Sequence, residues 1–325
     1  MSLEDKVVIE VALNENQLRA ANPNVPYTPE ELAADARRCL DAGAAVVHYH
    51  ARDPETQMTS TDIELNLACQ RAITEATTLI AYPTYGDAVP VGDGYYQVCS
   101  PAEVRFRHFV AGVERGIRFE IGPIDLGAFY DVNAMRVPGA PAGPDGIEGW
   151  VLNRGHQINN GLDHVWLARF CERYGLHKSF AAPDTMCLLN LRNMIDMGLV
   201  PEPTLDVKLF FFGGAALATR LRGMLELSRE LFADKSLRWM PVVQGADGFP
   251  LAELSLAEGG QVRTGLGDYS YGADGAPSNA QLVERLVALA RSFGREPADP
   301  HEARVIKGMT SLPSVTGAAP GDTPI

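Results

Sequence analysis

Two histidines stand two positions apart in the segment Val46-Val-His-Tyr-His50, which the sequence predicts to be a buried β-strand. Alternate residues of a strand point to the same face, so we expect His48 and His50 to converge on one point. Two converging imidazoles are the beginning of a metal site, and Zn²⁺ is the usual ion for such ligands. The alternative is a pair of ordinary histidines, which the strand context makes the weaker interpretation.

A second candidate pair lies near the end of the chain, in Gly259-Gly-Gln-Val-Arg-Thr-Gly-Leu-Gly-Asp268. Arg263 interrupts an otherwise apolar strand pattern, so its charge needs a partner or a water-filled opening. An aspartate beside an arginine is oriented and kept ionised, as a general base requires, and Asp268 fits that role. A salt bridge that only closes the fold is the alternative for this pair.

Strand patterns alternate with helical patterns along most of the chain, which predicts a parallel sheet with crossover helices. The expected strands are 7–12, 44–50, 79–82, 117–121, 178–182, 206–212, 239–244 and 261–266. The expected helices are 29–42, 61–75, 101–115, 162–174, 188–196, 216–231, 251–258 and 279–293. Eight such units favour an α/β fold of the (β/α)8 TIM-barrel type, with long βα loops at 85–100 and 122–161. An open doubly wound sheet would show a glycine-rich turn after its first strand, and Leu13-Asn-Glu-Asn16 is not one.

Barrel enzymes place their chemistry at the carboxyl ends of the strands, where residues far apart in sequence meet. Four further polar residues follow or end predicted strands, and we expect them to contact substrate: Glu15, Asn16, Thr84 and Glu120.

Composition excludes several classes of protein. The 325-residue chain carries a net charge of −13, which argues against binding to nucleic acid or to an anionic membrane surface. No apolar run reaches the length of a membrane span, and the five cysteines are scattered, which favours a cytoplasmic protein. We expect one barrel domain over residues 1–310, followed by an extended or disordered tail over 311–325.

Three stretches of the chain resemble the β-keto acid cleavage enzymes, the family typified by 3-keto-5-aminohexanoate cleavage enzyme. They are residues 22–31, residues 42–53 around the two histidines, and residues 259–268. The resemblance implies an oligomeric TIM barrel with a divalent metal, typically Zn²⁺, held by His48 and His50. It also implies that a β-keto acid condenses with acetyl-CoA to give acetoacetate and a new acyl-CoA, with Arg263 and Asp268 as the catalytic pair.

The chain departs from the family pattern at several of these positions. The family's third metal ligand is a glutamate where this chain has Gly267, and Glu120 is our candidate replacement. The glutamate after the first strand aligns with Asn16, or with Glu15 if the loop shifts by one. The family's serine after the third strand falls on Pro83, which leaves Thr84 as the nearest hydroxyl. A glutamate on the fifth strand falls on Ser179, so we expect a substrate without an amino group.

Two other interpretations stay open. A metal-dependent aldolase or lyase would use the same enolate chemistry without CoA. A catalytically weakened barrel that binds a metabolite is the third, and Gly267 is the residue that supports it.

Overall fold

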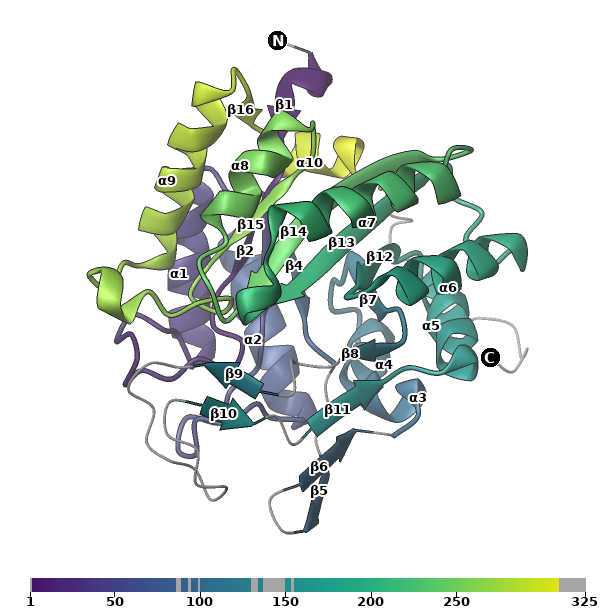
Figure 1. Ribbon diagram of the computed structural model, residues 1–325. Helices are drawn as coiled ribbons and strands as arrows, with labels where there is room; N and C mark the ends of the chain where they lie inside the picture. The colour runs from purple at the N-terminus through teal and green to yellow at the C-terminus, as the bar shows by residue number, and fades with distance from the viewer. Residues whose placement is uncertain are drawn as a thin grey trace.

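Two four-stranded parallel sheets close into one barrel. A computed structural model describes residues 2–85, 89–92, 95–98, 100–129, 134–136, 150–152 and 155–309 of the chain. One sheet has the order β15 (Val262–Thr264), β2 (Ile9–Ala12), β3 (Val46–Tyr49), β4 (Ile80–Pro83). The other has the order β14 (Ser236–Gln244), β13 (Thr204–Phe212), β12 (His177–Ala182), β7 (Ile121–Asp125). Because β4 contacts β7 and β14 contacts β15, the two sheets form a single eight-stranded wall (Figure 1), which confirms the predicted fold class.

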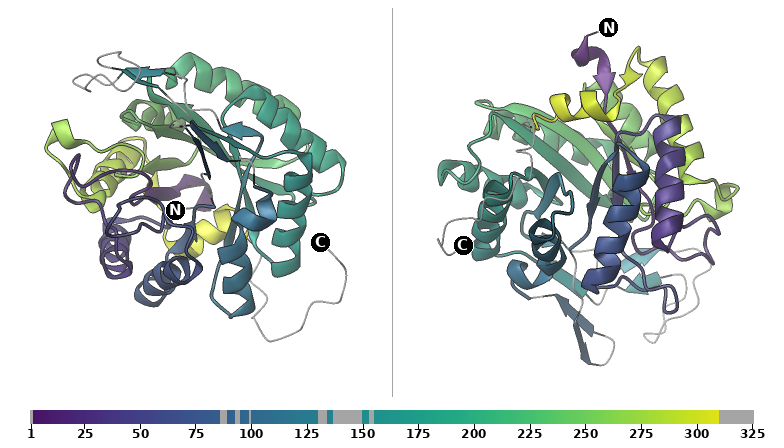
Figure 2. Two further views of the ribbon diagram at one scale, coloured as in Figure 1. Left: turned by 90° about the horizontal axis from the view of Figure 1, so that it is seen from below. Right: turned by 180° about the vertical axis from the view of Figure 1, so that it is seen from behind.

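Helices surround this wall and connect its strands, as the views in Figure 2 show. They are α1 (Pro29–Ala42), α2 (Ile63–Ala76), α3 (Ala102–Arg105), α4 (Arg107–Glu114), α5 (Gly161–Tyr174), α6 (Thr185–Asp196), α7 (Ala218–Leu231), α8 (Phe249–Ala257), α9 (Asn279–Ser292) and α10 (Pro300–Ile306). Local sequence sets their ends: Thr28 and Glu31 form a reciprocal capping box at the start of α1. Gly43 ends the same helix with a φ of 114°, a conformation that glycine adopts without strain.

Most predicted elements differ from the structure by no more than about three residues at an end, and two differ further. The strand expected at 117–121 lies instead at Ile121–Asp125, where it pairs with β12 from His177 to Ala181. The helix expected at 101–115 is divided at Phe106 into α3 and α4. The shift of β7 moves Glu120 from the expected end of its strand to the position before its start.

Smaller elements complete the described chain. The 3-10 helices are η1 (Leu3–Asp5), η2 (Gly213–Ala215) and η3 (Gly272–Asp274). A short parallel pair joins β1 (Lys6–Val7) to β16 (Glu296–Pro297). The long loops carry β5 (Val89–Gly92), β6 (Tyr95–Val98), β8 (Ala128–Phe129), β9 (Ala134–Arg136), β10 (Trp150–Leu152) and β11 (Gly155–Ile158). The tail predicted at 311–325 lies outside the described residues.

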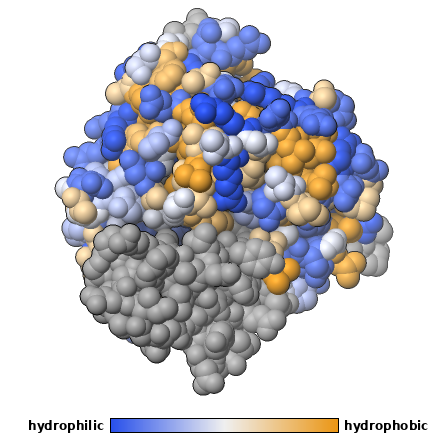
Figure 3. All heavy atoms as spheres, viewed as in Figure 1, coloured by the Kyte–Doolittle hydropathy of each residue, from blue (hydrophilic) through white to orange (hydrophobic). Residues whose placement is uncertain are grey.

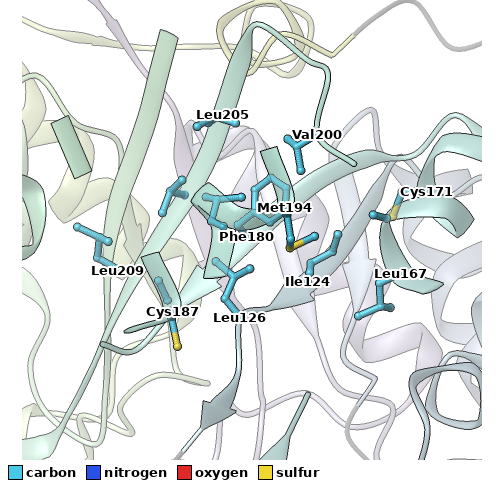
Figure 4. Close-up of a cluster of buried hydrophobic side chains, with 14 of the residues drawn as sticks. Ile124, Leu126, Leu167, Cys171, Phe180, Cys187, Met194, Val200, Leu205 and Leu209 are labelled. Atoms are coloured by element: carbon cyan, nitrogen blue, oxygen red, sulfur yellow. The ribbon is translucent and has the colours of Figure 1, made fainter. Parts of the chain in front are cut away.

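Apolar packing between the sheet and its helices supplies the rigidity of the scaffold. Figure 4 shows this packing where β7, β12 and β13 meet α5 and α6, with Phe180 and Met194 facing each other across the layer. A smaller group of buried side chains fills the inside of the barrel: Ala181, Phe210, Phe212, Met240 and Val242. A barrel filled in this way is a packed core, so chemistry is confined to its ends.

The amino ends of the strands are closed by α10 and the residue that follows it. Lys307 is fully buried and both oxygens of Asp206 lie 2.8 Å from its Nζ. Arg304 donates to both oxygens of Glu120, at 2.6 and 2.7 Å. We call this set of ion pairs the floor cluster. Among the described residues, no helix is long and apolar enough to cross a membrane.

Candidate active site

Three side chains with metal-binding atoms converge at the carboxyl ends of β2 and β3. Glu15 follows β2, His48 lies in β3 and His50 follows it. The Nε2 atom of His48 is 3.7 Å from Glu15 Oε1, and that of His50 is 3.8 Å from Glu15 Oε2. The ligand atoms of the three residues all lie within 4.8 Å of one another. The two rings are perpendicular, with centroids 5.3 Å apart, so both histidines lie on one face as the sequence predicts.

Hydrogen bonds to the other ring nitrogen orient both imidazoles. His48 Nδ1 lies 3.2 Å from the carbonyl oxygen of Tyr82, to which it donates. His50 Nδ1 lies 3.1 Å from Thr59 Oγ1, whose hydroxyl in turn donates to Asn16 Oδ1 at 2.8 Å. Each Nδ1 therefore carries the proton, and each Nε2 turns its lone pair toward Glu15.

Glu15 reaches this position from a loop whose backbone is unusual. Its φ is +36°, in the left-handed region that few residues other than glycine adopt, which marks a constrained loop. Gln244 Nε2 donates to Glu15 Oε2 at 2.5 Å, and Arg263 Nη2 donates to Oε1. A Cβ atom at Gly267 would lie 2.7 Å from Glu15 Cγ, so the glycine makes room for this side chain.

Arg263 joins the three ligands to a second carboxylate. Its Nε and Nη2 donate to the two oxygens of Asp268, at 2.9 and 2.7 Å. Its Nη1 donates to Glu10 Oε1 at 3.0 Å. The same Glu10 oxygen accepts from Lys208 Nζ at 2.8 Å and from the Tyr82 hydroxyl at 2.6 Å. We call the set of Glu10, Glu15, His48, His50, Lys208, Arg263 and Asp268 the mouth cluster.

Burial controls the charges of the mouth cluster. It lowers the pKa of His48 well below its usual range and that of His50 to about 3, so both imidazoles are neutral and available as ligands. Burial raises the pKa of Glu15 to about 7, with Asp268 adding to the effect and Arg263 opposing it. Burial also raises the pKa of Asp268, although Arg263 opposes that shift. A bound divalent cation would stabilise Glu15 in its ionised form.

The structure does not bring all the predicted residues together. Glu120 lies before β7, at the amino end of the barrel, where it pairs with Arg304 and Arg118, so it does not reach the histidines. Ser179 lies within β12, opposite Asp206, with its Oγ buried and without a described hydrogen-bond partner. Thr84 follows β4, where its N–H donates to the carbonyl of Tyr49. Asn16 contacts the site through Thr59.

Sequence reasoning missed five residues of the site: Glu10, Thr59, Tyr82, Lys208 and Gln244. A signal for two of them was present, because Glu10 and Lys208 interrupt apolar strands in the same way as Arg263. Gln244 ends β14 and carries no comparable signal.

Two neutral imidazoles and one carboxylate are a donor set found in catalytic zinc sites, which keep a further position open. The residues present therefore fit a divalent metal ion. The adjacent Arg263–Asp268 pair places a buried carboxylate beside that position, as proton abstraction requires.

Comparisons with known proteins agree with this chemistry. A sequence model for beta-keto acid cleavage enzymes matches residues 6–309. The 3-keto-5-aminohexanoate cleavage enzyme of Acetoanaerobium sticklandii is 28% identical, over 94% of this chain and 99% of that protein. The 3-oxoadipate:acetyl-CoA acetyltransferase of Cupriavidus necator is 25% identical, over 96% of this chain and 98% of that protein.

Solved structures support the fold. Apo ObcA superposes with a TM-score of 0.65 at 15% identity, covering 88% of this chain and 66% of ObcA, so this chain spans slightly less than two thirds of that protein. A type I 3-dehydroquinate dehydratase from Clostridium difficile gives a TM-score of 0.50 at 10% identity, covering 89% of this chain and 92% of that one.

Proposed function

Because this chain belongs to the β-keto acid cleavage enzyme family, we propose that it condenses a β-keto acid with acetyl-CoA at the mouth cluster. The products are acetoacetate and the CoA ester of the remaining acyl fragment. The observation that carries the proposal is the convergence of Glu15, His48 and His50 beside the Arg263–Asp268 pair.

We assign the metal to these three ligands, with Glu15 in the role that we expected Glu120 to take. Zn²⁺ is the ion that two imidazoles and a carboxylate favour. Such an ion would polarise the ketone carbonyl of the substrate and so acidify the neighbouring carbon. Thr59 and the carbonyl of Tyr82 fix the two imidazoles, which keeps both Nε2 lone pairs on one point.

Asp268 is the proposed base. Burial raises the pKa of its carboxyl group, which makes the ionised form a stronger proton acceptor than an exposed aspartate. Arg263 holds both carboxylate oxygens, so the direction in which Asp268 accepts a proton is set before substrate binds. The Glu10 and Lys208 pair holds Arg263 from the opposite side.

We further propose that the keto acid carries no amino group. An ammonium group buried inside the barrel would need a carboxylate partner. The carboxylates of the mouth cluster, Glu10, Glu15 and Asp268, are each already paired with Arg263. Ser179, which lies opposite Asp206 toward the floor cluster, supplies no carboxylate either.

The direct test incubates the purified, metal-loaded protein with β-keto acids whose far ends are cationic, neutral or carboxylate. Acetoacetate is measured with and without acetyl-CoA. We expect acetoacetate only with acetyl-CoA, and little turnover of the cationic substrate. Cleavage that ignores acetyl-CoA would instead identify an aldolase or lyase. In a separate preparation purified without added metal, clearly less than one metal ion per chain would favour the metabolite-binding barrel.

A matched pair of variants tests the metal ligand. Glu15→Gln and Glu55→Gln each remove one carboxylate with little change in shape, but Glu55 is exposed in the loop after β3. We expect Glu15→Gln to lose both metal and acetoacetate formation, and Glu55→Gln to keep both. Equal metal content in the two variants would remove Glu15 from the ligand set.

A homo-oligomer remains a prediction, as does the cytoplasmic location. Figure 3 shows apolar residues gathered over the α7 side of a mixed surface. Met186 and Leu189 of α6 and Leu217, at the N-cap of α7, are large apolar residues that are exposed. Light scattering of the purified protein measures the oligomeric state directly.

A further inference from the structure

A small polar pocket lies beside the mouth cluster, outside the residues assigned so far to catalysis. It is formed by the residues before α2, by the residue after β4, and by the junction of α3 and α4. Its enclosed part has room for about one water molecule, and the rest of its space is open to solvent. Its polar lining includes Ser60, Thr61, Thr84, Arg105, Arg107 and His108.

Arg105 is a buried cation, and one of its hydrogen-bond donors has no described partner. Only 3% of the residue is exposed. Its Nε donates to the carbonyl of Ser100 at 2.8 Å, and its Nη2 donates to Asn159 Oδ1. Within the described part of the chain, Nη1 has no hydrogen-bond partner, and the carboxylate of Asp163 is 3.9 Å from Nη2. A buried guanidinium with an unused donor calls for a further acceptor, preferably an anionic one.

Arg107 adds a second positive charge to the same pocket. It is half-buried, and its Nη2 donates to the carbonyl of Thr61 at 3.2 Å. None of the residues that line the pocket is a carboxylate. Asp163, which lies 3.9 Å from Arg105 outside the lining, offsets one of the two charges, so the pair of arginines keeps a net positive charge on a chain of net charge −13.

His108 contributes shape rather than charge. Its Nε2 donates to the carbonyl of Thr84 at 2.9 Å, and burial lowers its pKa to about 4, so the ring is neutral near pH 7. This bond ties the start of α4 to the end of β4, which holds the pocket next to the barrel opening.

The pocket is connected to the mouth cluster through adjacent residues. Ser60 follows Thr59, which contacts His50. Thr84 lies two positions after Tyr82, whose carbonyl accepts from His48. The pocket and the two histidines therefore lie at the same end of the barrel, where β3 and β4 finish.

We propose that Arg105 and Arg107 form an oxyanion subsite that holds a phosphate or carboxylate group of a reactant. This proposal rests on the proposed function for the identity of the reactant, but not for the binding itself. The two sources with this chemistry are the phosphates of acetyl-CoA and the far carboxylate of a dicarboxylic β-keto acid. Guanidinium groups bind both through paired N–H donors.

The first experiment measures binding without catalysis. Inorganic phosphate is titrated into the metal-loaded protein while the thermal midpoint is followed. The variants are Arg107→Gln and, as control, Arg115→Gln, which removes the same charge from the end of α4, where Arg115 pairs with Glu64. We expect the phosphate affinity to fall about tenfold in Arg107→Gln, the loss of one charged hydrogen-bonding group, and to stay at the wild-type value in Arg115→Gln.

The second experiment identifies the source of the anion. KM is compared for acetyl-CoA and acetyl-pantetheine, which lacks the phosphates, and for keto acids with neutral and carboxylate ends. A rise in KM of Arg107→Gln for acetyl-CoA alone assigns the subsite to the CoA phosphates. A rise for the carboxylate-ended keto acid alone assigns it to substrate.

Equal phosphate affinity in wild type and Arg107→Gln would overturn the subsite, whatever the enzyme catalyses. A protein that forms no acetoacetate but still loses phosphate affinity in Arg107→Gln would reject the proposed function and keep the subsite. Circular dichroism of both variants establishes that each is folded before the comparison is made.

Discussion

The two ends of the barrel both contain buried charges, but they are arranged differently. In the floor cluster, Lys307 meets both oxygens of Asp206, so the ion pair is complete within the chain. In the mouth cluster, Arg263 is shared by Glu10, Glu15 and Asp268. Three carboxylates there face two cations, Arg263 and Lys208, and two neutral imidazoles add lone pairs at the same point.

We infer from this difference that the charges of the floor cluster stabilise the fold, whereas those of the mouth cluster are arranged to bind a ligand. Removing either partner of a complete buried ion pair strongly destabilises the fold, and such a pair has no free atoms with which to bind a ligand. Buried ligand atoms that converge on one point destabilise the folded state unless a cation binds among them. The comparison predicts that variants at the mouth change activity and metal affinity, whereas variants at the floor change stability.

Asp268→Asn should give the largest effect. Asparagine keeps the shape but cannot accept the proton, so kcat should fall on the order of 10²- to 10⁴-fold. Metal content should stay the same, because Asp268 is outside the three-residue ligand set. Acetoacetate formation and metal analysis on the same sample check both expectations, and an active variant would exclude Asp268 as the base.

Lys307→Met should act on stability instead. It leaves the Asp206 carboxylate buried without its cation, which costs about 3 to 5 kcal/mol of unfolding free energy. Urea denaturation measures the loss. The double variant Asp206→Asn/Lys307→Met removes both charges and should recover part of it. If the single and double variants were equally unstable, the ion pair would not be the cause.

Gln244→Leu should weaken metal binding without abolishing it. Gln244 donates to Glu15 Oε2, and loss of such a partner typically costs about 10- to 100-fold in metal affinity. A chelator competition measures the affinity. Gln17→Leu is the control, because the only described hydrogen bond that the Gln17 side chain donates is a 3.4 Å contact with the carbonyl of Gly267. Equal affinities in the two variants would show that Gln244 does not position Glu15.

The smallest effect concerns acid stability. Burial opposes ionisation of Asp206, but Lys307 and His177 outweigh it and hold the pKa of Asp206 below its usual 3.8. The unfolded chain therefore binds the proton first, so this contribution is present above about pH 4 and is lost as the pH falls below it. Unfolding free energy should drop by up to about 1.4 kcal/mol per pH unit for this one group. The double variant Asp206→Asn/Lys307→Met should show a shallower slope, and an unchanged slope would assign acid sensitivity to other carboxylates.

Much of the scaffold could be predicted from the sequence because local signals set it. The capping box at Thr28 and Glu31 and the stop at Gly43 place α1 at the expected residues, 29–42. The spacing of His48 and His50 predicted their shared face, since side chains alternate along a strand. The recognition of the family and its enzymatic class is confirmed by the match over residues 6–309.

What failed depends on contacts between distant segments. Residues 117–121 alternate like a strand, but pairing with β12 decides that the strand begins at Ile121, and this moves Glu120 to the opposite end of the barrel. The placement of Glu15 depends on the space left by Gly267, more than 250 residues away in sequence. A single sequence does not show which loops meet, so it did not show that Glu15, and not Glu120, lies beside the two histidines.

The burial of Lys307 has a consequence for synthesis of the chain on the ribosome. Asp206 is translated about 100 residues before Lys307. The two carboxylate oxygens of Asp206 therefore lack the Lys307 ammonium group until the segment after α10 has been made. A nascent chain that ends after α9 would contain the strands of the barrel wall but lack the lysine that meets both oxygens of Asp206. The Asp206–Lys307 ion pair therefore forms only after all the strands of the barrel wall have been translated.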